Sequence, residues 1–378
     1  MKWRMFICAI CFLIGGCSLN IPLEDQFSDP DAITDVLSAR SLLASAYKAM
    51  PQQIFQLSVL SDDFCPSQHL NKDMSLQGLY NWREVEMTEL AGTLWAGYYA
   101  VIAEVNALLA RIDAVVTLDE TEKLEKMRIV CEAKALKSWC YFDLLRLFAP
   151  RYEGNENKDG IILKKRVELD FLPRSSVKEC VTEIRTLLNE ARNVDNTQKN
   201  VYWLSDKAVA YLQVELELYA GNYPAVLELT KDLETEYPES VLGADVYKYL
   251  WSSENSDARI FGKYQLEQIY MDIRFDTFEK GDYLVLSQNV DYEEEDIRKE
   301  WSEIPFVMPD AKNVRLLGKY NKMNRDKVAS KYVKLFPACG VNALAGLRYC
   351  PGSPAKRSAS REHIQPSALD CRSRASDS

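Results

Sequence analysis

The sequence predicts a mainly α-helical fold, in which antiparallel helix pairs form a scaffold for a loop-rich face of mixed structure. Three observations lead to this prediction. Apolar residues recur at helical spacing from about residue 31 to residue 236, and short polar links separate the periodic stretches. After Pro238 the pattern gives way to short alternating stretches, turns and acidic residues. With 378 residues, 47% of them hydrophobic, the chain can bury a sizeable core.

Residues 1–16 have the composition of an export signal. Two cations precede an apolar stretch from Met5 to Ile14, which at about ten residues is too short to cross a bilayer. Two glycines then precede Cys17 in LIGGCSLN, a pattern that resembles the bacterial lipobox. We expect Cys17 to be acylated, so that several acyl chains anchor the mature protein through a spacer over residues 17–35. A plain signal peptide with an incidental cysteine is the alternative.

The first three helices are predicted from their apolar faces. The stretch Asp31–Met50, which ends before Pro51, gives an amphipathic helix. Two longer helices over Thr93–Ile112 and Glu122–Ala149 are joined by a short polar link, which indicates an antiparallel pair, and Pro150 ends the second. The positions expected to face the core of this pair are Trp95, Tyr98, Tyr99, Ile102, Val105, Leu108, Leu109 and Ile112, then Leu124, Ile129, Ala133, Leu136, Cys140, Tyr141, Leu144 and Phe148.

A capped helix and a repeat-like helix pair follow. Ser175 or Ser176 precedes the apolar positions of VKECVTEIRTLLNEAR, where either side chain can cap the helix. The stretch KAVAYLQVELELYAGNYPAVLELTKDLETEYPES reads like one tetratricopeptide unit. It has Gly221 in the turn, Val226 where a small residue packs the two helices, and Pro238 after the second helix. Since each pair buries its open face by stacking on the next, we expect tetratricopeptide-like hairpins through the scaffold.

Composition argues against several classes of function. The net charge is −10, or −12 without the two cations of the leader, so we expect no nucleic-acid partner. The chain has two histidines, His69 and His363, which leaves little from which to build a His-based metal site or catalytic triad. Cys131 and Cys140 stand among apolar residues in helical sequence and are interpreted as small core residues. We therefore expect a binding protein and no enzyme.

Several segments together resemble one family, the SusD/RagB nutrient-binding lipoproteins of Bacteroidetes. They are, in family order, the lipobox, SARSLLASAYKAM, the spacing Trp95-x-x-Tyr98-x-x-x-Ile102-x-x-x-Asn106-x-Leu108-Leu109-x-x-Ile112, EAKALKSWCYFDLLRLFAPRY from Glu132, LPRSSVKECVTEIRTLLNEAR, KAVAYLQVELELYAGNY and YEEEDIRKEW. The resemblance implies four tetratricopeptide-like units with a loop-rich face and no catalytic machinery. It also implies a surface-exposed, lipid-anchored protein of the outer membrane that covers a SusC-like TonB-dependent transporter and delivers a glycan or other nutrient to it.

A sugar site calls for exposed aromatic rings beside amide or carboxylate groups, because sugar faces stack on rings and sugar hydroxyls need polar partners. The stretch DDFCPSQHLNKDMSLQGLYNWRE is predicted to be a polar loop, and it holds Tyr80, Asn81 and Trp82. Trp82 is the first candidate for a stacking platform, since family members can contribute a tryptophan from this region. Packing of Trp82 in the core is the competing interpretation. Three aromatic residues on apolar helical faces are assigned to the core: Trp95, Trp139 and Tyr141.

Other candidates for ligand binding lie at both ends of the predicted domain. Asp62 and Asp63 could bond sugar hydroxyls or a structural calcium ion, or could be solvated loop acids. Trp251, flanked by polar residues, and Trp301 are further candidate stacking rings. The run DYEEEDIRKE is interpreted as a solvated face.

The C-terminal segment differs from the rest of the chain. After Pro337 the sequence becomes basic and serine-rich and shows no long helical face. We expect residues 339–378 to be out-of-frame sequence that follows an incomplete SusD-like domain over residues 36–338; a natural disordered tail is the alternative. Resequencing of the locus distinguishes the two.

Two functions of different class follow from these observations. The first is surface binding of a glycan or other nutrient for a transporter, and the second is a helical-repeat scaffold at the outer membrane that binds only protein partners. A binder needs its loop aromatics such as Trp82, whereas a scaffold does not. Stacking platforms serve many sugars and even peptides, so the prediction extends to the ligand class only.

Overall fold

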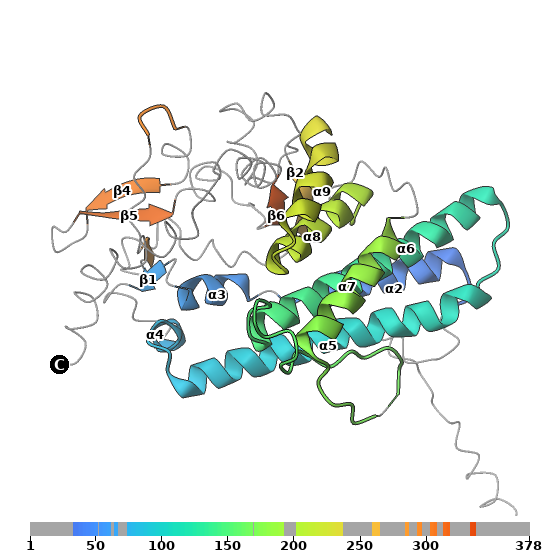
Figure 1. Cartoon of the computed structure of the whole chain (residues 1–378), viewed down its shortest axis with the longest axis horizontal. Helices are drawn as coiled ribbons and strands as arrows, with labels where there is room; N and C mark the ends of the chain where they lie inside the picture. The colour runs from blue at the N-terminus through green and yellow to red at the C-terminus, as the bar shows by residue number, and fades with distance from the viewer. Residues whose placement is uncertain are drawn as a thin grey trace, which may run out of the picture.

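A computed structural model shows long helices side by side, with the shortest helices and one group of strands toward one end (Figure 1). The structure describes residues 33–51, 53–61, 64–66, 74–168, 170–192, 202–236, 259–264, 284–286, 293–296, 303–307, 313–317 and 333–337. Most of these residues are helical, so the predicted mainly α fold is confirmed.

The helices pack as successive neighbours along the chain. They are α2 (Val36–Ala49), α3 (Ile54–Leu60), α4 (Met74–Tyr80), α5 (Glu84–Arg111), a 3-10 turn (Ile112–Ala114), α6 (Glu120–Phe148), α7 (Val177–Ala191), α8 (Asp206–Tyr219) and α9 (Tyr223–Glu236). Helices α2, α5 and α6 contact one another, α7 packs on α6, α8 on α7, and α9 on α8. The predicted pairs α5–α6 and α8–α9 are therefore both present.

Local side-chain chemistry sets several helix ends. Asp35 begins α2, accepting a 2.7 Å hydrogen bond from the Ser38 amide, and Asp119 begins α6 in the same way. Of the two candidate serines before α7, it is Ser176 that caps the helix, in a reciprocal capping box with Glu179.

The strands are short and lie mostly late in the chain. Strands β1 (Phe64–Pro66), β3 (Leu284–Leu286), β5 (Asn313–Leu317) and β4 (Glu303–Val307) form an antiparallel sheet in the order β1-β3-β5-β4. A second, two-stranded sheet pairs β2 (Arg259–Tyr264) with β6 (Val333–Pro337). The described strands β2 to β6 all lie after Pro238, where the helical pattern of the sequence gives way to short alternating stretches. The strands bring distant parts of the chain together, since β1 pairs with β3.

The stretch from residue 62 to residue 84, predicted to be a polar loop, holds both β1 and α4. The prediction was wrong because these elements are too short to show a clear period, although Leu76, Leu79 and Tyr80 of α4 are buried at helical spacing. Helix α4 thereby brings the end of this stretch to the start of α5.

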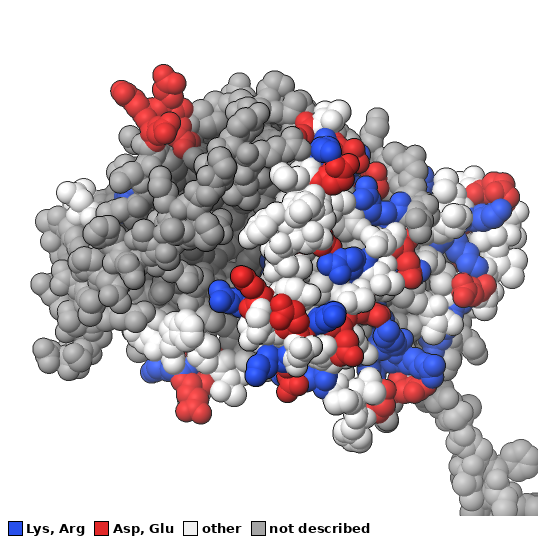
Figure 2. All heavy atoms as spheres, viewed as in Figure 1, with Lys and Arg blue, Asp and Glu red and all other residues white. Residues whose placement is uncertain are grey.

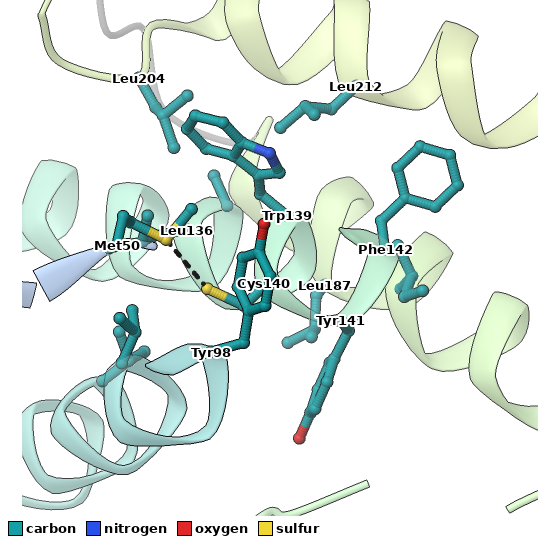
Figure 3. Packing of buried hydrophobic residues seen from close by; sticks show 14 of the residues in the cluster. Met50, Tyr98, Leu136, Trp139, Cys140, Tyr141, Phe142, Leu187, Leu204 and Leu212 are labelled. Carbon is teal, nitrogen blue, oxygen red and sulfur yellow. Dashed lines mark hydrogen bonds between the residues drawn. The ribbon is translucent and has the colours of Figure 1, made fainter. Parts of the chain in front are cut away.

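A continuous core joins the helical layers. Trp139 and Tyr141 of α6 are fully buried, as predicted, and Figure 3 shows the Trp139 ring between Leu204 and Leu212. Trp139 also meets Phe261 of β2 edge-to-face at 5.5 Å, so the β2–β6 sheet is seated on the helices. Cys131, Cys140 and Cys180 are free and buried, which confirms the prediction for the first two.

Five positions predicted to face the core are not fully buried: Leu124, Trp95, Tyr99, Leu109 and Phe148. Leu124 is exposed, because it stands on the first turns of α6, beyond the end of α7 that reaches Cys131. Trp95 is only partly buried, and its ring packs on Tyr99 and Phe148. Periodicity predicts which face of a helix is apolar but not how far its neighbours extend.

Helix α5 is long and apolar enough, by length and composition alone, to cross a membrane. Its apolar side instead contacts α2 and α6 and contributes eight buried residues to the core. We interpret it as a core helix.

Candidate ligand-binding site at the α4–α5 turn

The turn between α4 and α5 exposes Trp82 on a fixed backbone. The amide of Arg83 donates to Gly78 O at 2.9 Å and the amide of Trp82 donates to Leu79 O at 3.0 Å, which is the Schellman pattern of helix termination. The pattern places Trp82 in the left-handed region, with φ of 56°. Its side chain is 59% exposed, so the competing interpretation of core packing is wrong.

The same motif ends α8, with a different residue at the left-handed position. There the amide of Asn222 donates to Glu217 O and that of Gly221 donates to Leu218 O, and Gly221 has φ of 72°. Glycine adopts this conformation freely, whereas a residue with a Cβ atom pays roughly 1–2 kcal/mol. A bulky aromatic residue held there, with its ring in solvent, points to a role for that ring.

The neighbours of Trp82 divide into structural and accessible groups. Tyr80 is buried in the core and presents no face to a ligand. Asn81 donates from Nδ2 to Gln77 O at 2.9 Å and closes α4, although its side chain lies at the surface. Arg83 is exposed and forms an ion pair with Glu86. Of the three residues predicted from this stretch, Trp82 alone offers an aromatic face, with an amide and a guanidinium on either side of it.

The arrangement suits binding. An indole ring can stack on the apolar face of a sugar, while the neighbouring amide and guanidinium groups can bond hydroxyls. Within the described residues no group of three or more His, Cys, Asp and Glu side chains could hold a metal ion. Figure 2 shows Lys and Arg interleaved with Asp and Glu over the helical face in view, a charge pattern typical of a solvated surface.

The remaining predicted site residues lie outside the described residues, and for them the predictions stay predictions: Cys17, Asp62, Asp63, Trp251 and Trp301. The acidic run is described in part. Glu293, Glu294 and Glu295 are exposed, as expected for a solvated face.

Polar residues in the segment from Glu132 hold helices together. The Glu132 carboxylate is buried and accepts from Arg40 Nη1 of α2 at 2.9 Å. Arg40 also donates to Glu125 at 2.8 Å. Tyr47 lies 3.5 Å from the same Glu132 oxygen, and burial raises the pKa of Tyr47 well above its ordinary value. This cluster joins α2 to α6 and serves the fold.

A second polar cluster, centred on Asp143, joins three helices. Tyr98 of α5 donates to Asp143 Oδ2 at 2.9 Å, and Arg146 forms an ion pair with the same carboxylate. Arg146 also lies 3.6 Å from Glu215 of α8. The buried carboxylate is thus held by a hydroxyl and a guanidinium, which is a structural arrangement.

A third cluster, around Lys137, was missed from the sequence. Lys137 is buried, its Nζ donates to Asn106 Oδ1 at 2.6 Å, and Asn106 Nδ2 donates to Lys164 O at 2.9 Å. Tyr141 donates to the same carbonyl at 2.6 Å. Burial lowers the pKa of Lys137 to about 8. A lysine in the middle of the apolar stretch of α6 was the signal that could have indicated this cluster.

The structure is thus a scaffold of stacked helical pairs that presents an exposed aromatic ring on a fixed turn. The chain belongs to the SusD-like family, whose family model, described as "Starch-binding associating with outer membrane", matches residues 23–214. The resemblance to the SusD/RagB family is thereby confirmed. No curated protein matches the chain.

Solved structures share the fold at low sequence identity. A SusD-like carbohydrate binding protein from Bacteroides vulgatus is 15% identical, with 82% of this chain and 70% of that chain covered and a TM-score of 0.67. A SusD superfamily protein from the same organism is 18% identical, with 85% and 77% covered and a TM-score of 0.67. Another, from Bacteroides fragilis, is 18% identical, with 82% and 74% covered and a TM-score of 0.63.

Proposed function

We propose that this protein binds a glycan, or another nutrient, at the outer surface of the cell and delivers it to a SusC-like TonB-dependent transporter. The observation that carries the proposal is the exposed ring of Trp82. The backbone of this residue has a strained, positive φ at a turn that ends a helix. The family's description as starch-binding and associated with the outer membrane supports both the ligand class and the location. Acylated Cys17 is the membrane anchor in this proposal, and residues 17–35 are the spacer between the anchor and the helical domain.

The fixed turn favours binding at Trp82 for an entropic reason. The backbone of Trp82 is fixed by two hydrogen bonds before any ligand arrives, and an indole ring has few rotatable bonds. Little conformational freedom is therefore lost on binding, so the stacking contact contributes fully to affinity. We propose Asn81 and Arg83 as the flanking groups that bond hydroxyls.

Retention of the mature protein on a panel of immobilised glycans tests the proposal. Trp82→Ala and Trp82→Gly should each weaken retention about tenfold, because both remove the stacking ring. Tyr223 offers a matched control, since it is an aromatic residue of nearly equal exposure (61%) at the start of α9. Tyr223→Ala should leave retention unchanged. Undiminished retention of both Trp82 variants would contradict a site at this turn.

The alternative function is a scaffold that binds only protein partners at the outer membrane. Val116 and Leu118, exposed in the link between α5 and α6, favour it, because such side chains suit a protein surface and not a sugar. On this alternative no glycan is retained by the wild-type protein, while the protein still co-purifies with its transporter. Glycan retention that depends on Trp82 excludes it.

We propose that the protein acts without catalysis and without a cofactor; Asp62 and Asp63 are either solvated loop acids or ligands of a structural calcium ion. Loss of thermal stability on chelation, restored by calcium and lost in Asp62→Asn/Asp63→Asn, tests the ion. Glycans recovered unchanged after long incubation with the protein would agree with binding alone, whereas shortened products would contradict it.

A further inference from the structure

The loop between α6 and α7 is closed at its base like an Ω-loop. The amide of Gly160 donates to Ser175 O at 2.7 Å, and the amide of Ser175 donates back to Ile161 O at 2.8 Å. Asp159 and Ser176 form an antiparallel bridge beside this pair. Residues 162–174, of which 162–168 and 170–174 are described, therefore leave the scaffold and return to it at one point.

The outgoing segment of the loop, residues 162–164, is fixed to α5 and α6. Tyr99 OH donates to Ile162 O at 2.8 Å and accepts from the Ile162 amide at 2.9 Å. Asn106 and Tyr141 both donate to Lys164 O, and Lys137 fixes the orientation of the Asn106 amide by occupying its oxygen. Buried side chains thus set the direction in which the loop leaves.

The interior of the loop and its returning segment, residues 170–174, are fixed as well. The Lys164 ammonium contacts the Asp170 carboxylate and Glu168 O across the loop. In the returning segment, Arg174 donates to Gly160 O at 2.8 Å and to Phe148 O at 3.1 Å. Its guanidinium lies 4.9 Å from the centre of the Trp95 ring. The loop is therefore organised before it meets any partner.

The tip of this organised loop is apolar. Phe171 is fully exposed, Val167 is 58% exposed and Leu172 is exposed beside them. Arg166 is exposed at the tip, where it lies 3.8 Å from the exposed Glu168 carboxylate, and Lys165, which pairs with Glu183 at 2.7 Å, stands next to it. In Figure 1 the loop projects below α5, on the side away from the labelled strands.

We propose that this loop touches a lipid surface, with Phe171, Val167 and Leu172 entering the interface of the bilayer and Arg166 and Lys165 meeting headgroup phosphates. Apolar tips flanked by cations bind membranes by the sum of buried area and electrostatic attraction. The family's association with the outer membrane brings such a surface within reach.

Two other occupants fit the loop less well. A sugar needs polar partners beside the ring, and the chain neighbours of Phe171 are the apolar Leu172 and Asp170, which is already paired to Lys164. A specific protein interface needs about 800 Å² on each partner, whereas the apolar residues here are confined to the tip of one projecting loop.

Vesicle co-sedimentation tests the proposal without any glycan or transporter. The full mature chain, made with Cys17→Ser so that no acyl group contributes, is mixed with vesicles of phosphatidylethanolamine and phosphatidylglycerol. We expect binding that falls about tenfold in Phe171→Ala and is kept in Phe171→Trp, because tryptophan also favours the membrane interface. Leu118→Ala, which removes another highly exposed apolar side chain (85% exposed) from a different loop, should bind as the wild type does.

Equal binding of the wild type and Phe171→Ala would overturn the proposal. A second result would also overturn it: the wild type does not bind vesicles, and Phe171→Ala no longer co-purifies with the transporter. The loop would then contact a protein and not a lipid surface. Because Phe171 is fully exposed, unfolding of the variant is not expected, and an unchanged melting temperature checks this. Trp82→Ala should bind vesicles normally, which separates this inference from the ligand site.

Discussion

Trp82 and Gly221 occupy the same left-handed position in two copies of one helix-ending motif. The chain therefore contains its own comparison between an aromatic residue and a glycine in that conformation. Glycine is the residue that this backbone favours, so the indole ring at Trp82 is held against a local preference. A binding role for the ring is the simplest physical reason for the exception.

Stability should separate the two substitutions at this turn. Trp82→Gly should be about 1 kcal/mol more stable than Trp82→Ala, because alanine keeps the Cβ atom that opposes positive φ. Gly221→Ala should be destabilising by a similar amount. Urea unfolding followed by circular dichroism measures both differences. Equal stability of the two Trp82 variants would argue against strain at this residue. If Trp82→Gly is the more stable variant and still loses glycan retention, that loss cannot be attributed to unfolding.

Lys137 should make stability depend on pH. Its folded pKa is about 8 against an ordinary value of 10.5, so the unfolded chain binds more protons between these values and the free energy of unfolding rises with pH there. Lys137→Met should lack this rise, which amounts to a few kcal/mol. Thermal melts between pH 7 and about 10 measure the difference from wild type.

Lys178→Met, which removes an exposed lysine on α7, serves as the control and should keep the wild-type dependence. A Lys137→Met protein whose stability still climbs through this window would show that another group is responsible. Burial raises the pKa of Tyr47, Tyr98 and Tyr141, so these tyrosines lose protons first in the unfolded chain and lower the stability near pH 10, but this effect is common to all three proteins and cancels in the comparison.

At the scale of elements, the Arg40–Glu132 pair joins α2 to α6. The Glu132 side chain is completely buried, so Arg40→Met would remove the cation that balances this buried carboxylate and should cost about 3–5 kcal/mol, although the Tyr47 hydroxyl stays beside the same oxygen. Arg40→Met/Glu132→Leu should recover much of this loss, because no buried charge remains. Urea unfolding of the three proteins measures the two effects.

Lys123→Met is the matched control for that experiment, since it breaks a solvent-exposed ion pair with Glu120. Its effect should stay below about 1 kcal/mol. If Arg40→Met were equally mild, the buried pair would contribute no more than a surface pair does, and the proposed link between α2 and α6 would fail.

Long elements were predictable and short ones were not. Helices α2, α5, α6, α8 and α9 repeat their apolar positions over several turns, and Pro51, Pro150 and Pro238 indicated where α2, α6 and α9 end. The seven residues of α4 and the three of β1 give too little period to recognise. The candidate site depends on this difference, because Trp82 was found by its residue type whereas its fixed turn depends on α4.

At the scale of the whole molecule, the anchor is the prediction to test. Wild-type protein should incorporate labelled palmitate and pellet with membranes, and Cys17→Ala should do neither, because Cys17 is the proposed acylation site. Cys8→Ala, which changes a cysteine inside the leader, should behave as the wild type does. Membrane pelleting of Cys17→Ala would argue for a different attachment.

The division of the chain into a signal peptide (residues 1–16), a spacer (17–35), a SusD-like domain (36–338) and a C-terminal segment (339–378) stays a prediction.

Helical period is a local property that each segment carries alone, so the amino-acid sequence was enough to predict the mainly α class and the order of the long helices, and the resemblance of several segments was enough to indicate the family. Only the tertiary structure showed that Trp82 is exposed on a strained turn, that Tyr80 is buried, and that Lys137 and Asn106 fix the loop that presents Phe171. These features depend on which helices cover which residues and on how far each helix extends. Contacts between residues distant in the chain decide both, and no local pattern records them.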